Sequence, residues 1–247
     1  MAFPVILFGP DGVQYTTNAA RQWPLGTRLY LPDGRIFAYA ENGATAMVAG
    51  NLYQSEVPGA NFDDLAVAAT AAGAVLVTVT NGVTAIAAND FDGGYMVVQD
   101  DVGEGFVYGL RNHAAIAASV AGDINLQTGV SIQVAFTTAT TILLVKNEFK
   151  GVIIHPSPPT AALVGVACKA TAASEFGWLQ RHGLAAVLTD GTVVIGESVM
   201  PSNATDGSVE DWGLAEAAPP TEIGAAIGLV AEVAVTTEYS LIFLKLE

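Results

Sequence analysis

The three histidines and the single cysteine are the residues best suited to chemistry, and their spacing matches no catalytic or zinc-binding motif. His113, His155 and His182 lie far apart, with no HxH or HExxH pattern, and Cys168 has no second cysteine as a partner. The sequence also contains no G-x-S-x-G elbow and no Walker A loop. We therefore expect structural histidines, a buried structural thiol at Cys168, and a protein that is not an enzyme.

The acidic stretch NDFDGGYMVVQDDVGEG, at residues 89–105, is the other candidate for chemistry. Carboxylate oxygens are the ligands that Ca²⁺ prefers, but the order of the acids is not that of an EF-hand. Acidic residues at the ends of β-hairpins explain the stretch as well as a Ca²⁺ site does, so both interpretations stay open here, and we expect no other cofactor. The residues concerned are Asp90, Asp92, Asp100, Asp101 and Glu104.

Charge restricts the partners of this chain. Nine basic residues stand against 24 acidic ones, a formal net charge of −15, and no Lys or Arg occurs from Ile36 to Leu110. Nucleic acids and anionic membranes need a cationic surface, so we expect neither as a partner. The start of the chain lacks a basic leader region, and the longest apolar stretch, residues 65–88, is broken by an Asn-Gly pair. We therefore expect neither a signal peptide nor a membrane span.

Turn dipeptides separate many short apolar runs, which is typical of a mainly β protein with sandwich, barrel or β-tulip-like units. Asp-Gly occurs at 11, 33, 92, 190 and 206, and Asn-Gly at 42 and 81. Both dipeptides favour tight hairpins because they tolerate positive φ. Short helices are expected only over residues 63–72 and 112–122. No strict internal repeat is evident, which argues against a solenoid or a propeller.

The distribution of proline and glycine predicts three parts. Residues 1–60 are expected to form an extended arm and a hairpin, and residues 61–150 a β-rich middle domain. The Pro-rich connector HPSPPT, at 155–160, favours polyproline geometry. It lies near the start of a barrel-like domain expected over 151–247.

Tryptophan and arginine are the residues most often found as interface anchors. Three arginines lie in the predicted arm, and two tryptophans lie in loop-like contexts rich in Pro and Gly. Trp178 lies in a strand-like run, where packing in the core is as good an interpretation as exposure at an interface. The interface candidates are Arg21, Trp23, Arg28, Arg35, Trp178 and Trp212.

Several segments resemble virion structural proteins of tailed bacteriophages: PLGTRLYLPDGRIFAYAENG, GEGFVYGLRNHAA, LLVKNEFKGVIIHP, FGWLQRHGLAAVLTDGTVVIGESVMPS and TEYSLIFLKL. The C-terminal half resembles the small β-barrel or β-tulip decoration proteins of capsids. The resemblance implies a head decoration (cement) protein that binds the outer capsid surface and stabilises the lattice of the major capsid protein. It also implies a homotrimer located in the virion and assembled in the host cytoplasm.

The chain is longer than a minimal decoration domain. A tail, baseplate or fibre-associated protein that binds host glycans is therefore the alternative, and exposed aromatic residues would serve it as sugar-binding platforms.

Overall fold

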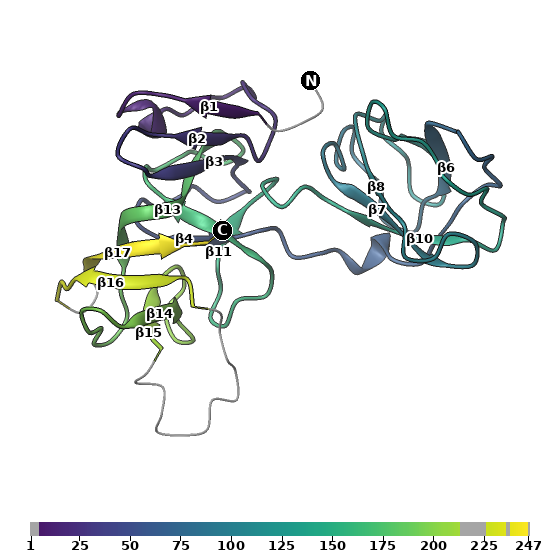
Figure 1. Ribbon diagram of the computed structural model, residues 1–247. Helices are drawn as coiled ribbons and strands as arrows, with labels where there is room; N and C mark the ends of the chain where they lie inside the picture. Colours follow the sequence, from purple (N-terminus) through teal and green to yellow (C-terminus); the bar gives the residue numbers. More distant parts are fainter. Residues whose placement is uncertain (1–4, 213–225, 236–237, 247) are drawn as a thin grey trace. The chain divides into compact units, whose positions relative to one another are not determined.

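The computed structural model describes residues 5–212, 226–235 and 238–246, and it is mainly β (Figure 1). Within the described residues the helical elements are two short 3₁₀ turns, η1 (Val13–Tyr15) and η2 (Ala60–Phe62). The mainly β class predicted from the sequence is confirmed. The described strands form no closed barrel, and the sandwich or β-tulip geometry stays a prediction.

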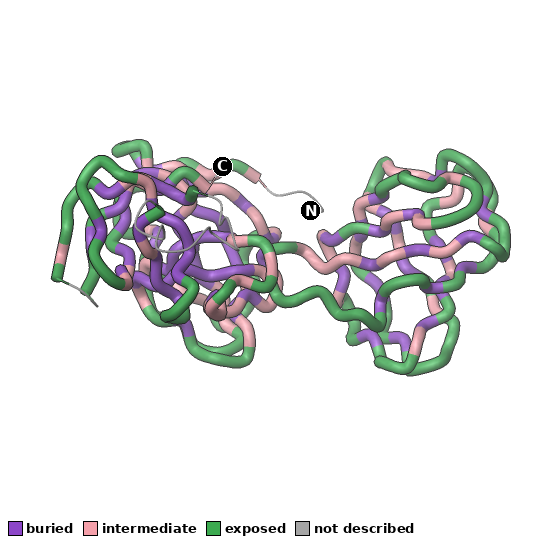
Figure 2. Tube along the Cα trace, turned by 90° about the horizontal axis from the view of Figure 1, so that it is seen from below, coloured by how far each residue is buried: buried purple, intermediate pink, exposed green. Residues whose placement is uncertain are grey.

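The chain divides into two compact units, and the boundaries differ from the three expected parts. One unit, the inserted unit, is Pro58–Asn147, and the other, the host unit, combines Pro4–Val57 with Glu148–Glu247. Buried side chains gather in one cluster inside the inserted unit and in two clusters inside the host unit. Figure 2 shows buried stretches, in purple, in both units. Separate cores indicate that each unit can fold by itself.

The host unit is built on one large sheet with the strand order β1-β2-β3-β13-β17-β16-β14-β15. Strand β12 also pairs with β13, β4 pairs with β12, and β11 pairs with β4. Its strands are β1 (Ile6–Phe8), β2 (Arg28–Tyr30), β3 (Ile36–Glu41), β4 (Leu52–Gln54), β11 (Ile153–Ile154), β12 (Leu163–Ala167), β13 (Phe176–Leu188), β14 (Ser198–Pro201), β15 (Val209–Asp211), β16 (Gly228–Glu232) and β17 (Tyr239–Lys245).

The described part of residues 1–60 is not an extended arm. Strand β3 is a central strand that pairs with β13 from Glu41↔Phe176 to Ile36↔His182, and the side chains of Phe37 and Tyr39 are fully buried. Almost every residue of β3 is buried, because the strand is covered on both faces. The first part of the chain therefore completes the sheet formed by the last part.

Strand β13 is 13 residues long, and its register is interrupted near its middle, an irregularity of the kind that bends a strand. The register shifts between Gln180 and His182, and Gly183 has φ +86°, a backbone conformation that other residues rarely adopt. Before the bend, Trp178 and Leu179 pack in one core cluster of the host unit. After it, Ala185 and Val187 pack in the other. The bend lets one strand serve both cores.

The inserted unit has two sheets around one apolar core. The strands β5-β10-β7-β8 form one sheet, and β6 pairs with β9 in the other. Buried side chains from both sheets, among them Val77, Ile124, Met96 and Ile142, belong to the same cluster. The strands are β5 (Leu65–Ala66), β6 (Leu76–Thr80), β7 (Tyr95–Asp100), β8 (Val107–Gly109), β9 (Ala121–Asn125) and β10 (Thr141–Val145).

The two short helices predicted over 63–72 and 112–122 are wrong. The first segment contains β5 and a bridge from Thr70 to Phe136, and the second contains a bridge from Ile116 to Ile86 before β9 begins. Both segments are rich in alanine, which favours helices. Their backbone groups bond to distant segments instead, so tertiary pairing overrides the local preference.

Six turns share one backbone pattern, although no strict repeat is evident in the sequence. If the first residue of a turn is numbered 1, the backbone N–H of residue 5 donates to the carbonyl oxygen of residue 2 in each turn, with N–O distances of 3.2–3.4 Å. The turns of Thr70 and Phe136 bond reciprocally through their first residues, as do those of Ile86 and Ile116, while the N–H of Met47 donates to Thr171. The fold is therefore repetitive at the level of turns. The six turns begin at Met47, Thr70, Ile86, Ile116, Phe136 and Thr171.

Two asparagines occupy matching positions in this pattern, one in each unit. The Nδ2 of Asn81 donates to the carbonyl oxygen of Thr84 at 2.8 Å and to that of Ala117 at 3.1 Å. The Nδ2 of Asn42 donates to the carbonyl oxygens of Thr45 and Ala172, both at 2.9 Å. Both side chains are almost fully buried. Each asparagine thus ties two turns of its own unit together.

We predict that replacing either asparagine destabilises one unit and leaves the other unchanged. Asn81→Ala leaves buried carbonyl groups without donors, which costs about 1–3 kcal/mol. It should lower the unfolding temperature of the inserted unit by about 5 °C or more. Asn42→Ala is the matched variant for the host unit. Differential scanning calorimetry should resolve two transitions, each shifted by one variant only. A single transition moved by both variants would contradict the division into units.

Candidate interaction surface

The three histidines and the cysteine each contact other residues of their own unit. In the inserted unit, His113 accepts the N–H of Phe91 through Nε2, at 3.1 Å. In the host unit, both ring nitrogens of the fully buried His155 face carbonyl oxygens, and the ring of His182 packs edge-on against Phe243. The Sγ of Cys168 donates to the carbonyl oxygen of Gln14 at 3.0 Å. Among the described residues of the host unit, these contacts pair neither His155 nor His182 with Cys168.

The acidic stretch at 89–105 does not gather into a cation site. Asp90 pairs with Lys146, with 3.2 Å between Oδ2 and Nζ, and Asp100 accepts the backbone N–H of Asp101. Asp101 accepts hydrogen bonds from the hydroxyls of Thr137 and Thr140, and the first of these bonds holds its pKa below the usual value. Across the described ranges, no group of three or more His, Cys, Asp or Glu side chains is placed to bind a metal ion.

No helix in the described part of the chain has the length and apolar composition needed to cross a bilayer.

The six interface candidates from the sequence all lie in the host unit, and they do not form one cluster. Trp178 is only 4% exposed and packs against Tyr39 with 5.0 Å between ring centroids, so it belongs to the core. Trp23 and Trp212 are exposed by 40% and 38%. Arg21 is exposed and Arg28 is half-buried. The sixth, Arg35, lines a cavity.

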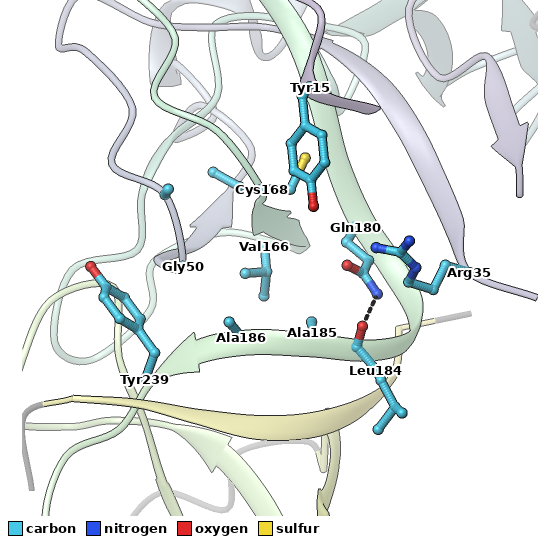
Figure 3. Close-up of a pocket in the computed structure, with 12 residues that line it drawn as sticks. Tyr15, Arg35, Gly50, Val166, Cys168, Gln180, Leu184, Ala185, Ala186 and Tyr239 are labelled. Carbon is cyan, nitrogen blue, oxygen red and sulfur yellow. Dashed lines mark hydrogen bonds between the residues drawn. The ribbon is translucent and has the colours of Figure 1, made fainter. Parts of the chain in front are cut away.

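The cavity, with a volume of about 220 Å³, lies between the second half of β13 and the end of β12 (Figure 3). Its walls are mainly small apolar side chains. Tyr15 and Tyr239 are exposed at its edge. Gly50 has φ +81°, and a Cβ there would collide with the ring of Tyr239. The lining residues are Tyr15, Arg35, Ala49, Gly50, Val166, Ala167, Cys168, Gln180, Leu184, Ala185, Ala186 and Tyr239.

At this cavity, the side chains of Gln180, Arg35 and Cys168 have partners inside the protein. The side-chain amide of Gln180 donates to the carbonyl oxygens of Leu184 and His182. Arg35 binds Asp33 (Nε–Oδ2, 2.6 Å) and Asp11 (Nη2–Oδ1, 2.8 Å). The pKa of Asp33 is lowered, first by the hydrogen bond from the backbone N–H of Arg35 and then by the guanidinium. The cavity is therefore suited to hold an apolar side chain.

An apolar sheet face adjoins the cavity and shares Leu184, Ala186 and Tyr239 with it. Strands β13, β17 and β16 bury Ala185, Ile242 and Val230 on their inner side. On their outer side the alternate residues are also largely apolar, although half-buried or exposed. We call this outer side the host face. Its residues are His182, Leu184, Ala186, Leu229, Glu232, Tyr239, Leu241, Phe243 and Lys245.

The inserted unit has a comparable surface, the insert face, on the outer side of β10-β7-β8. Its central row is Leu143, Val97 and Val107, placed side by side by the strand register. Tyr95 and Val145 form the next row. All five residues are half-buried or exposed, and Val107 is 58% exposed.

The second sheet of the inserted unit provides a comparison, because its outer side is mostly polar. There Thr78 donates to Asp123 at 2.6 Å, and Thr80 lies opposite Ala121. An antiparallel sheet with one face in water normally alternates apolar and polar residues in this way. The insert face and the host face depart from that alternation, and exposed apolar surfaces of this kind mark sites of interaction. Sequence reasoning missed both faces, although runs such as TILLV and YSLIFLKL, which are apolar at successive positions, carried the signal.

We predict that Cys168 is unreactive in the folded protein. Burial raises the pKa of its thiol to about 12, so about a thousandth of the usual thiolate is present at pH 8. Alkylation by iodoacetamide, followed by mass spectrometry, should be about a thousandfold slower than in 6 M guanidinium chloride. Equal rates in the two conditions would show that the half-buried thiol is neither shielded from solvent nor hydrogen-bonded to Gln14.

Comparison with known proteins adds no further constraint to this geometry. No family model, no curated protein and no solved structure matches the chain. A function must therefore be argued from the surfaces of the two units and from the resemblance of the sequence.

Proposed function

We propose that this chain is a bacteriophage head decoration (cement) protein, which binds the outer capsid surface and stabilises the lattice of the major capsid protein. The observation that carries the proposal is the apolar outer sheet face present in each unit. These faces, together with the resemblance to virion structural proteins, support a role in assembly. In this proposal the protein belongs to the virion, forms a homo-oligomer, expected to be a trimer, and is added in the host cytoplasm.

Apolar sheet faces suit this role because they supply binding energy without any chemistry. Burial of apolar surface contributes about 25 cal/mol per Å², so a modest face stabilises one contact by only a few kcal/mol. On a capsid the same contact recurs many times, and linked contacts strengthen one another through their high effective concentration. The net charge of −15 favours a capsid surface whose contact region contains Lys or Arg.

The alternative is a tail, baseplate or fibre-associated protein that binds host glycans. The observation in its favour is the partial exposure of Trp23 and Trp212, since exposed aromatic rings can stack on sugar rings. The two proposals differ in the number of copies per particle.

We predict that quantitative mass spectrometry of purified particles finds about one copy of this chain per copy of the major capsid protein. Decoration of a whole lattice requires a ratio of that order. A few copies per particle would support the tail or fibre alternative instead, and absence from purified particles would overturn both proposals.

We also predict that a charge in the insert face weakens binding to capsids. Val107 is an exposed residue of the central row, so Val107→Glu would place a carboxylate in the apolar contact and should reduce binding to undecorated capsids at least about tenfold. Val83→Glu is the matched control, because Val83 is 79% exposed in a loop outside the face. Co-sedimentation of each variant with capsids measures the effect. Equal loss in both variants would indicate a general charge effect and not a specific face.

A further inference from the structure

The host face has a regular arrangement that follows from the strand register. Leu184, Phe243 and Leu229 lie side by side across the three strands and form the central row. On one side of this row lie His182 and Lys245, which are paired in the register. On the other side lie Ala186, Leu241 and Glu232. The face is therefore apolar in the middle, with a cation at one end and an anion at the other.

The charged residues at the two ends are exposed and point to the outer side. Lys245 continues the alternation of Tyr239, Leu241 and Phe243 along β17, so its side chain lies on the same side as theirs. The register shifts between Val230 and Glu232, and this brings Glu232 opposite Leu241. Lys245 and Leu241 are four residues apart, a separation of about 13 Å along the strand.

This arrangement is complementary to itself under a two-fold rotation. If two host faces pack with antiparallel strands about an axis through the central row, Phe243 meets Phe243 of the second copy. Lys245 then lies over Leu241 of that copy, beside its Glu232. The same contact occurs a second time by symmetry, as in any isologous interface. Each Lys245 thus lies beside the Glu232 carboxylate of the other copy.

We propose that the host face binds a second copy of this chain through this two-fold contact, with Phe243 at its centre and two Lys245–Glu232 pairs at its ends. We choose a second copy as the partner because its host face carries Glu232 where Lys245 of the first copy lies, and the reverse. A trimer uses a different, head-to-tail kind of contact, so the two-fold contact would join chains or trimers to one another. It does not depend on the proposed function, because it is measured on the purified protein alone.

The contact should be weak in solution. The seven residues of β17, the seven of β13 that pair with it and the five of β16 cover roughly 300 Å² per copy, from the usual strand spacing and rise. A stable interface buries about 800 Å² per partner, and two chains of charge −15 also repel each other. We therefore expect an association in the range of tens to hundreds of micromolar, where analytical ultracentrifugation can measure it.

The first experiment is sedimentation equilibrium of the full chain at 10 μM to 1 mM in 0.15 M salt. The mass of the wild type should double across this range, whether it begins as a monomer or a trimer. Phe243→Glu should hold the mass at the lower value, whereas Tyr95→Glu, in the insert face, should still permit doubling. No doubling of the wild type, or doubling that persists in Phe243→Glu, would overturn the proposal.

The second experiment exchanges the charges. Lys245→Glu and Glu232→Lys should each weaken the association about tenfold, because each reverses two ion pairs of the symmetric contact. The double variant restores opposite charges and should return to within about threefold of the wild type. A double variant no better than the single ones would overturn the proposed pairing. Circular dichroism and the unfolding temperature of each variant check that loss of association is not loss of folding.

Discussion

The bend of β13 at Gly183 is the constraint on which the host unit depends. Before the bend, the strand pairs with β3 and β12, and after it the strand pairs with β17. The same change of direction leaves the cavity beside Leu184 and aligns the outer residues of β13 with those of β17. The pairing of β13 with β3 ends at His182 and Ile36, and the residues beyond Gly183 enter the second core of the host unit. The backbone freedom of a single glycine thus underlies the sheet, the cavity and the host face.

The distribution of charge differs between the loops and the two apolar faces. The acids are concentrated in turns and loops, as at Asp63, Asp64, Asp92 and Glu104, and strands β13 and β17 contain none. Negative charge thus keeps molecules apart wherever the surface is polar. Approach is least opposed at the sheet faces, so the pattern of repulsion helps to direct contacts to the apolar surfaces.

Sequence patterns predicted the mainly β class and the Asp-Gly turns. They failed where the local structure depends on contacts with residues far away in the sequence. All five Asp-Gly pairs have a glycine with positive φ, as expected for tight turns. The glycines of the two Asn-Gly pairs do not have a positive φ. There the side chains of Asn42 and Asn81 are buried and donate hydrogen bonds to the carbonyl oxygens of Ala172 and Ala117, which lie far away in the sequence. The arm predicted for residues 1–60 failed for a similar reason: proline and glycine suggested an extended segment, but β3 is buried by strands more than 100 residues away. The exposed Trp23 and Trp212 could be proposed from sequence, whereas the two faces depend on register, which local patterns do not define.

The place where the chain leaves and re-enters the host unit has a consequence for modularity. Strand β4 is the last host strand before the inserted unit begins at Pro58, and β11 is the first host strand after it ends at Asn147. These two strands pair directly, with Gln54 opposite Ile153. The two ends of the inserted segment are therefore held close together by the host sheet itself. Another domain whose termini are close together could be inserted between β4 and β11 without changing the strand order of the host sheet. This connection would let related chains exchange the segment by recombination, and it offers an attachment point for foreign domains in engineered variants of this chain.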